Sequence, residues 1–190
     1  MYDGADTVVL YEELAFQDVL PLTWRPMSSP VDRDLTHSFD ERNLRLLQAW
    51  DAMEEHVPEK PKAEDAPYVA EITRLDLKIN LLLDLVGQLL AANRLRPPAV
   101  PVRFNALGAM WRATGTLPEA GEQGIAEIYL RDCLAEPLRL AGRVTNVTPD
   151  GHIKVKFLPM GEAVSDLIEK LCFRRHRRQI AGARQPRRGQ

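Results

Sequence analysis

The sequence predicts an α+β fold in which a small antiparallel β-barrel is combined with a long helical hairpin and a C-terminal helix. Three observations lead to this prediction. A heptad pattern of apolar residues fills the middle of the chain, five short segments of period two follow it, and an amphipathic segment ends in an arginine-rich stretch. The chain has 190 residues, of which 45% are hydrophobic and 27% charged, so it can fold as one domain with an elaboration or as two small domains.

Charge and cysteine content narrow the class of protein. The net charge is −2, yet residues 174–188 hold seven arginines and no acid, and the first 24 residues contain no Lys or Arg. The two cysteines, Cys133 and Cys172, have neither metal-type nor disulfide-type spacing. The N-terminus lacks the basic and apolar regions of a secretory signal, so we expect a cytoplasmic protein.

Residues 36–57 are predicted to form an amphipathic helix. Thr36 or Ser38 can cap its start, and Glu41 follows Ser38 at the spacing of a capping box. The proline-rich connector 58–67 then leads into the next helix, which gives a hairpin. The apolar residues lie on or near one stripe: Phe39, Leu44, Leu47, Trp50 and Val57.

The next helix is predicted between Pro67 and Pro97, and its pattern is that of a coiled coil. Charged residues such as Asp76 and Lys78 exclude a membrane span, because a central Asp or Lys costs about 2.5–3.5 kcal/mol on insertion scales. Apolar residues instead recur at intervals of three and four, as at heptad positions a and d. The seam consists of Tyr68, Ile72, Leu75, Ile79, Leu82, Val86 and Leu89, with the polar Asn93 at a further a position.

This seam predicts self-association. Ile or Val at a with Leu at d favours two strands, but Leu83 and Leu90 at e and Leu85 at g widen the apolar surface. One partner helix cannot cover so wide a surface, so we expect a bundle of three or four helices, with a tetramer foremost. Asn93 can fix the register of such a bundle. The alternative is an internal core helix that packs on residues 36–57.

From Ala99 onward the pattern indicates β-strands. The runs of period two cover residues 99–104, 108–114, 124–132, 137–147 and 152–159. In the last run, Ile153 and Val155 alternate with Lys154 and Lys156, and the sequence TPDG at 148–151 predicts a hairpin turn. Several short strands at this spacing are typical of a small antiparallel barrel.

A final amphipathic helix is predicted up to Gly182, a helix-stop residue. One face carries Val164, Leu167, Ile168 and Leu171. Three interpretations of the arginines at its end stay open: a solvated helix end with a frayed tail, a docking patch for a protein or acidic ligand, or a nucleic-acid contact.

The strands together with VKFLPMGEAVSDLIEKLCFRRHRRQ at 155–179 resemble a PilZ domain, and the heptad helix resembles the tetrameric PilZ proteins of xanthomonads. The resemblance covers residues 99–180 and adds 16–27 as the first barrel strand, which makes the helical region an insertion. We therefore expect four parts: an N-terminal segment with the first strand at 1–35, a helical oligomerisation insertion at 36–96, a barrel with its C-terminal helix at 97–182, and a basic tail at 183–190.

The PilZ resemblance implies binding of cyclic di-GMP, or control of type IV pili and motility through protein contacts. Members that bind the ligand carry an RxxxR stretch before the first strand and a [DN]xSxxG stretch after the next one, because arginine donors suit phosphate and guanine. Here no Arg precedes Leu20. Arg103, Asn105 and Gly108 stand at the three positions of the second motif, and only Gly108 matches it.

We therefore expect a non-catalytic signalling or scaffold protein that contacts its own copies and a signalling or pilus-assembly protein. The alternative is a cyclic di-GMP receptor with a relocated site, and a nucleic-acid-binding barrel is a third interpretation. No P-loop, GxSxG or GxGxxG motif and no histidine pair occurs, so we expect no catalysis, cofactor or metal. The candidate residues for a ligand or partner are Arg103, Asn105, Gly108, Arg174, Arg175 and Arg178.

Overall fold

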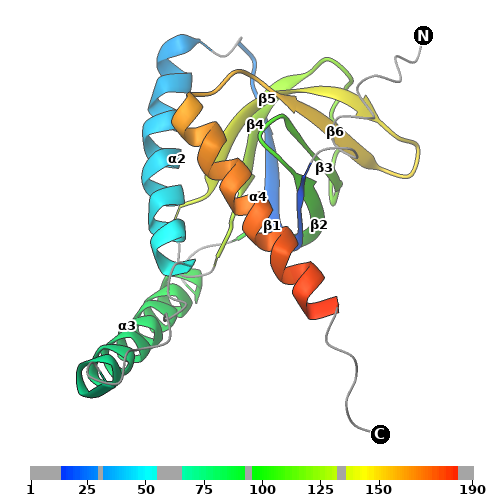
Figure 1. Ribbon diagram of the computed structural model, residues 1–190. Helices are drawn as coiled ribbons and strands as arrows, with labels where there is room; N and C mark the ends of the chain where they lie inside the picture. The colour runs from blue at the N-terminus through cyan, green and yellow to red at the C-terminus, as the bar shows by residue number, and fades with distance from the viewer. Residues whose placement is uncertain (1–13, 30–31, 55–65, 93–95, 132–135, 184–190) are drawn as a thin grey trace, which may run out of the picture.

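Figure 1 shows a computed structural model of the chain, which describes residues 14–29, 32–54, 66–92, 96–131 and 136–183. Segments with the helical period form helices and segments with a period of two form strands. The α+β class is therefore confirmed. In chain order the elements are β1 (Phe16–Pro26), α2 (Arg33–Glu54), α3 (Ala66–Ala92), β2 (Ala99–Phe104), β3 (Gly108–Arg112), β4 (Gln123–Ile128), β5 (Leu138–Val147), β6 (His152–Phe157) and α4 (Glu162–Ala183).

The six strands form the predicted closed antiparallel barrel, in the order β1-β2-β3-β6-β5-β4. Strand β1 closes it, because its first half pairs with β2 and its second half pairs with β4. The period of two decides which residues point inward: along β6, Ile153 and Val155 are buried in the core, and the lysines between them face outward. Closure leaves no free strand edge on the sheet.

The predicted turn at 148–151 joins β5 to β6. Gly151 has a φ of 85°, which glycine adopts without steric cost, and its N–H donates to the carbonyl of Thr148 at 2.9 Å. The pKa of the Asp150 carboxyl is lowered, first by a hydrogen bond from the Thr148 side chain and second by one with His152, whose Nδ1 lies 2.7 Å away. The turn is therefore held by side chains as well as by backbone.

Helix α2 packs on the barrel and on α4. Its Leu47 and Trp50 are buried, and its buried Asn43 side chain bonds to both backbone groups of Arg139 in β5, at 2.7 Å and 2.9 Å. The helix begins at Arg33, earlier than predicted, because the Asp32 carboxylate accepts from the N–H of Leu35 at 2.8 Å and acts as the N-cap. The predicted caps at 36 and 38 therefore lie inside the helix.

Helix α4 lies across the barrel, beside α2 (Figure 1). Three of its four predicted apolar residues, together with Cys172, are buried in the core, and Leu167 is partly buried against it. The Cys172 thiol donates to the carbonyl of Phe104 at 3.6 Å, and burial raises the pKa of this thiol to about 12. The helix continues to Ala183, one residue beyond the predicted stop.

Helix α3 projects away from the barrel (Figure 1). The apolar face of α2 is buried against β5 and α4, so α2 and α3 are consecutive helices that do not pack along one another over their described residues. The structure therefore does not support the alternative in which α3 is an internal core helix on residues 36–57. None of the described helices contains a stretch that is apolar and long enough to span a bilayer.

Candidate functional site

The predicted heptad seam lies on an open face of α3. Its seven apolar side chains between Tyr68 and Leu89 are each between 48% and 74% exposed. Asn93, the last predicted seam position, lies outside the described residues. Contiguous exposed apolar surface of this kind marks an interaction site, because water disfavours it. The structure thus leaves uncovered the residues that the sequence assigned to contact between subunits.

A second apolar stripe runs along another side of the same helix. Leu77, Leu81 and Leu85 follow one another at intervals of four and are 71%, 59% and 47% exposed. On an α-helix this spacing places them on one face, about 120° away from the centre of the seam. Leu77 and Leu81 were not among the predicted residues, although their spacing of four is visible in the sequence. Helix α3 therefore presents apolar surface in two directions.

The next candidates, Asn105 and Gly108, shape the turn between β2 and β3. The buried Asn105 side chain accepts from the N–H groups of Leu107 and Gly108 through Oδ1, at 2.9 Å and 3.1 Å. A Cβ atom at Gly108 would lie 2.4 Å from the carbonyl oxygen of Val155. Both residues therefore have structural reasons to be there, and a ligand role for them stays a prediction.

Arg103 lies on the outer face of the barrel. Strand pairing places it opposite Gln17 of β1 and Met110 of β3, whereas its neighbour Phe104 points into the core. Strand pairing on both sides therefore holds the backbone of Arg103 in place. An arginine in this position can contact a partner that approaches the sheet from outside.

The arginines of α4 hold the helix in place. Arg174 Nη1 donates to Asp51 Oδ1 of α2 at 2.7 Å, and Lys170 Nζ donates to the other oxygen at 2.8 Å. Arg175 pairs with Asp18 of β1. Arg174 and Arg175 thus reach two different elements instead of converging with Arg103. Arg178 is exposed further along the helix, and a ligand role for all of them stays a prediction.

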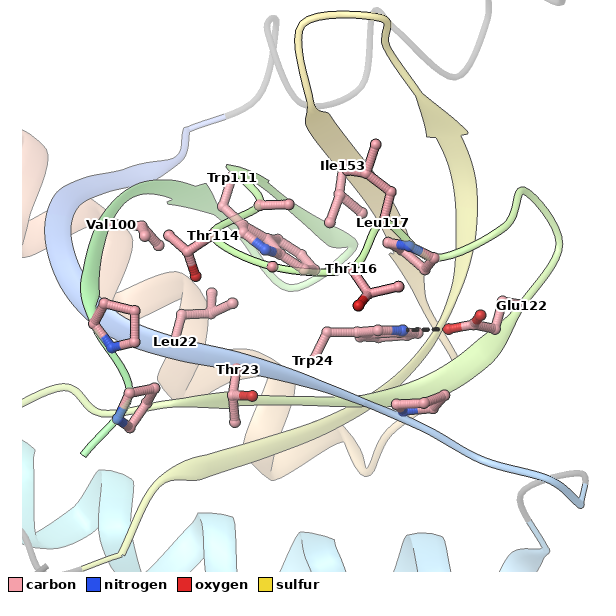
Figure 2. A pocket seen from close by; sticks show the side chains of 16 residues that line it. Leu22, Thr23, Trp24, Val100, Trp111, Thr114, Thr116, Leu117, Glu122 and Ile153 are labelled. Carbon is pink, nitrogen blue, oxygen red and sulfur yellow. Dashed lines mark hydrogen bonds between the residues drawn. The ribbon is translucent and has the colours of Figure 1, made fainter. Parts of the chain in front are cut away.

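A pocket of about 340 Å³ opens where β1 approaches the loop between β3 and β4 (Figure 2). Trp24 and Trp111 line it with ring centroids 6.2 Å apart, and Trp24 Nε1 donates to Glu122 Oε1 at 2.7 Å. A Cβ at Gly124 would lie 2.5 Å from the Trp24 ring, so glycine makes room for the indole. Lys, Arg and His are absent from the described lining, which makes the pocket unsuitable for a phosphate group.

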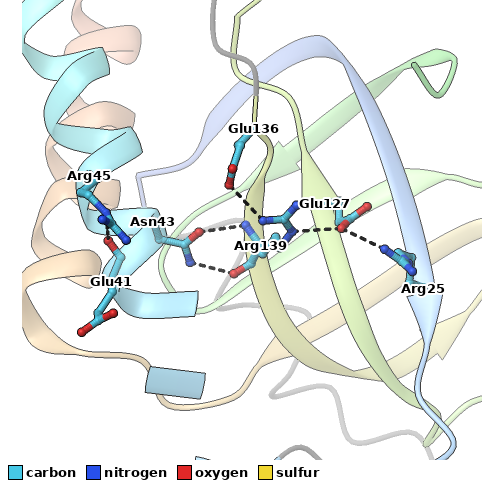
Figure 3. A network of polar contacts seen from close by, with 7 residues as sticks. All are labelled: Arg25, Glu41, Asn43, Arg45, Glu127, Glu136 and Arg139. Carbon is cyan, nitrogen blue, oxygen red and sulfur yellow. Dashed lines mark hydrogen bonds and ion pairs between the residues drawn. The ribbon is translucent and has the colours of Figure 1, made fainter. Parts of the chain in front are cut away.

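One buried carboxylate links three strands (Figure 3). Glu127 of β4 is only 7% exposed, and its Oε1 accepts from Arg139 Nε at 3.1 Å and from Arg25 Nη1 at 3.4 Å. The two guanidinium groups compensate the loss of hydration that a buried carboxylate suffers. Since Arg139 also carries the backbone groups that Asn43 binds, the network fixes α2 on the barrel.

Two kinds of reactive group, a metal site and a reactive cysteine, can be checked among the residues that the structure describes. No cluster of three or more His, Cys, Asp or Glu side chains that could hold a metal occurs there. Cys172 is buried, and its raised pKa keeps it protonated, which makes it a poor nucleophile.

The comparisons with known proteins assign the family. The profile of the atypical PilZ domain, described as a cyclic di-GMP receptor, matches residues 46–185. The chain belongs to this family. Among solved structures, it is similar to a pathogenic protein from Xanthomonas campestris, described as a tetrameric PilZ domain self-assembled via an unusual helical bundle. The two share 25% identity with a TM-score of 0.71, over 93% of this chain and 96% of the other. Curated protein sequences give no match.

The resemblance to PilZ domains that the sequence predicted is thus confirmed. Sequence reasoning missed the acidic partners of the α4 arginines in this PilZ protein. Asp51 and Arg174 are 123 positions apart, and Asp18 and Arg175 are 157 positions apart. No periodic signal connects such distant residues, so only the packing of α4 on α2 and β1 reveals the pairs.

Proposed function

We propose that this PilZ protein is a non-catalytic scaffold that self-assembles through α3 into a tetramer. It acts through protein contacts in a bacterial cyclic di-GMP, type IV pilus, motility or virulence pathway. The exposed heptad seam of α3 is the observation that carries the proposal. The PilZ protein from Xanthomonas campestris, which is described as assembling via a helical bundle, supports it.

The energetics of α3 favour a bundle over a pair of helices. Full burial of one large apolar side chain contributes about 1.5–3 kcal/mol, so the exposed seam provides a strong driving force for association. In a two-helix pair, the seam is covered and Leu77, Leu81 and Leu85 stay in water. In a four-helix bundle each helix contacts two neighbours, and both stripes are covered.

Substitution of Leu75 and Leu82 by Asp tests this assembly. The two carboxylates would have to be desolvated at the centre of the seam, so we expect the tetramer to give way to a species of 21.5 kDa in sedimentation velocity. The matched control is Thr73→Asp with Asn80→Asp, which adds the same charge at heptad position b, outside the seam. A wild-type protein of 21.5 kDa, or a double variant with unchanged mass, would contradict the proposal.

A second candidate function is reception of cyclic di-GMP at a non-standard site, which the description of the matched family favours. Three of the candidate residues predicted from the sequence, Arg103, Arg174 and Arg178, are assigned to such a site. The proposed scaffold function predicts no heat of binding when the wild-type protein is titrated with cyclic di-GMP in a calorimeter. Saturable binding in the micromolar range, weakened by Arg103→Ala, would establish the receptor function instead.

A further inference from the structure

Four of the six barrel strands carry positive charge without any negative charge. Strands β2, β3, β5 and β6 contain six Lys or Arg residues and no Asp or Glu. The acids of the barrel strands lie on the other two, as Asp18 of β1 and Glu127 of β4. The cations are Arg103, Arg112, Arg139, Arg143, Lys154 and Lys156.

Strand register gathers five of these cations on one outer face, which we name the basic sheet face: Arg103, Arg112, Arg143, Lys154 and Lys156. Lys156 lies opposite Arg143 on one side and opposite Gly108 on the other. In the next row, Met110 lies between Arg103 and Lys154. Arg112 stands opposite His152. Because neighbouring strands lie about 4.8 Å apart, all these side chains fall within reach of a single partner.

Three of the cations are available for a partner. Arg112, Arg143 and Lys156 are exposed, and the described part of the chain offers them no ion-pair partner. The direct opposition of Arg143 and Lys156 across the β5–β6 pair costs stability, since like charges at opposed positions repel. A bound anionic group would remove this repulsion.

The composition of the basic sheet face selects the class of partner. Phe, Tyr and Trp are absent from its outward positions in the described strands, so it lacks the stacking platform of single-stranded nucleic-acid sites. The chain as a whole has a net charge of −2, which disfavours a long polyanion. Met110 at the centre with Arg and Lys around it resembles the anatomy of a protein interface, where Met and Arg are enriched.

The size of the face limits the partner further. Four strands and three rows of alternate residues cover on the order of 200 Å². A standard interface buries about 800 Å² on each side, so the basic sheet face alone suits a short segment rather than a whole domain. The closed barrel offers no free strand edge, so such a segment is recognised by side chains and not by strand addition.

We infer that the basic sheet face docks a short acidic segment of a partner protein, whose carboxylates pair with Arg112, Arg143 and Lys156. This inference does not rest on assembly through α3. It goes beyond the proposed function because it assigns the chemistry of a partner to residues outside α3 and outside the arginine-rich end of α4.

Fluorescence anisotropy with a fluorescein-labelled octamer of glutamate tests the inference on the full chain. We expect the double variant Arg143→Glu/Lys156→Glu to bind the peptide about tenfold more weakly than the wild type. The matched control Arg42→Glu/Arg45→Glu changes the net charge equally on the exposed side of α2, and we expect it to bind within about twofold of the wild type. Near-native circular dichroism of the face variant keeps loss of folding apart from loss of binding.

Three outcomes would overturn the inference. One is the absence of saturable binding of the octamer by the wild type. Another is an equal loss in both charge-reversed variants, which would reflect net charge alone. The third is tighter binding of a single- or double-stranded DNA of the same charge than of the peptide, which would make the face a nucleic-acid site.

Discussion

At the scale of the residue, Gly108 illustrates how one position carries two explanations. It is the single match to the [DN]xSxxG motif of ligand-binding PilZ domains, which suggests a ligand. In the structure, the missing Cβ lets β3 approach β6, because a methyl group there would lie 2.4 Å from the Val155 carbonyl oxygen. Packing alone therefore accounts for glycine at this position.

Substitution by alanine measures this packing role. We expect Gly108→Ala to lower the free energy of unfolding by about 1–3 kcal/mol, because the Val155 backbone must move to admit the methyl group. Gly115→Ala is the control, since a Cβ at Gly115 meets no atom within 4 Å, and we expect a change within about 0.5 kcal/mol. Urea unfolding of the three proteins at one concentration measures both effects, and equal stability of all three would contradict the packing role.

At the scale of the element, the arginines of α4 act as anchors. Arg174 and Lys170 both bind the Asp51 carboxylate on α2, and Arg175 binds Asp18 on β1. These pairs hold α4 on two neighbouring elements, on both sides of its last buried residues, Leu171 and Cys172. Part of the arginine-rich stretch that suggested a binding patch therefore serves the fold.

A double-mutant cycle measures the strength of this anchor. The side chains of Asp51 and Arg174 are only 17% and 26% exposed, so we expect a coupling free energy of about 1–1.5 kcal/mol between Asp51→Ala and Arg174→Ala. The control cycle is His37 with Glu41, an exposed pair on α2, with an expected coupling below about 0.5 kcal/mol. A coupling near zero for Asp51 and Arg174 would mean that this ion pair does not help to hold α4 on α2.

Sequence patterns predicted the helices and strands of this protein more completely than they predicted the contacts between these elements. The period of two located every barrel strand after residue 98, because each strand has one face in the core and one in water. The heptad pattern located α3, because its seam is regular. The pattern could not show that the apolar face of α2 is buried against β5 and α4, since an amphipathic stripe does not identify its partner. Nor could it place Arg112, Arg143 and Lys156 on one face, which requires the strand order of the barrel.

At the scale of the whole molecule, the unit that folds is separate from the unit proposed to assemble. The hydrophobic core contains residues of the barrel, α2 and α4, and no residue of α3 belongs to it among the described ones. Charges introduced on the seam should therefore disrupt contacts between subunits and leave the core intact. This separation makes α3 a suitable target for tests of assembly.

The dependence of stability on protein concentration tests this division. Assembly adds stability by mass action, so for a tetramer a hundredfold rise in concentration should add up to about 2 kcal/mol per subunit to the apparent free energy of unfolding. The Leu75→Asp/Leu82→Asp variant should unfold cooperatively at one urea midpoint, whatever its concentration. Tryptophan fluorescence reports the transition, because Trp24 and Trp111 lie in the barrel. If the variant were unfolded without urea, α3 contacts would be needed for the barrel itself. If the wild-type midpoint were independent of concentration, the exposed seam would have no role in assembly.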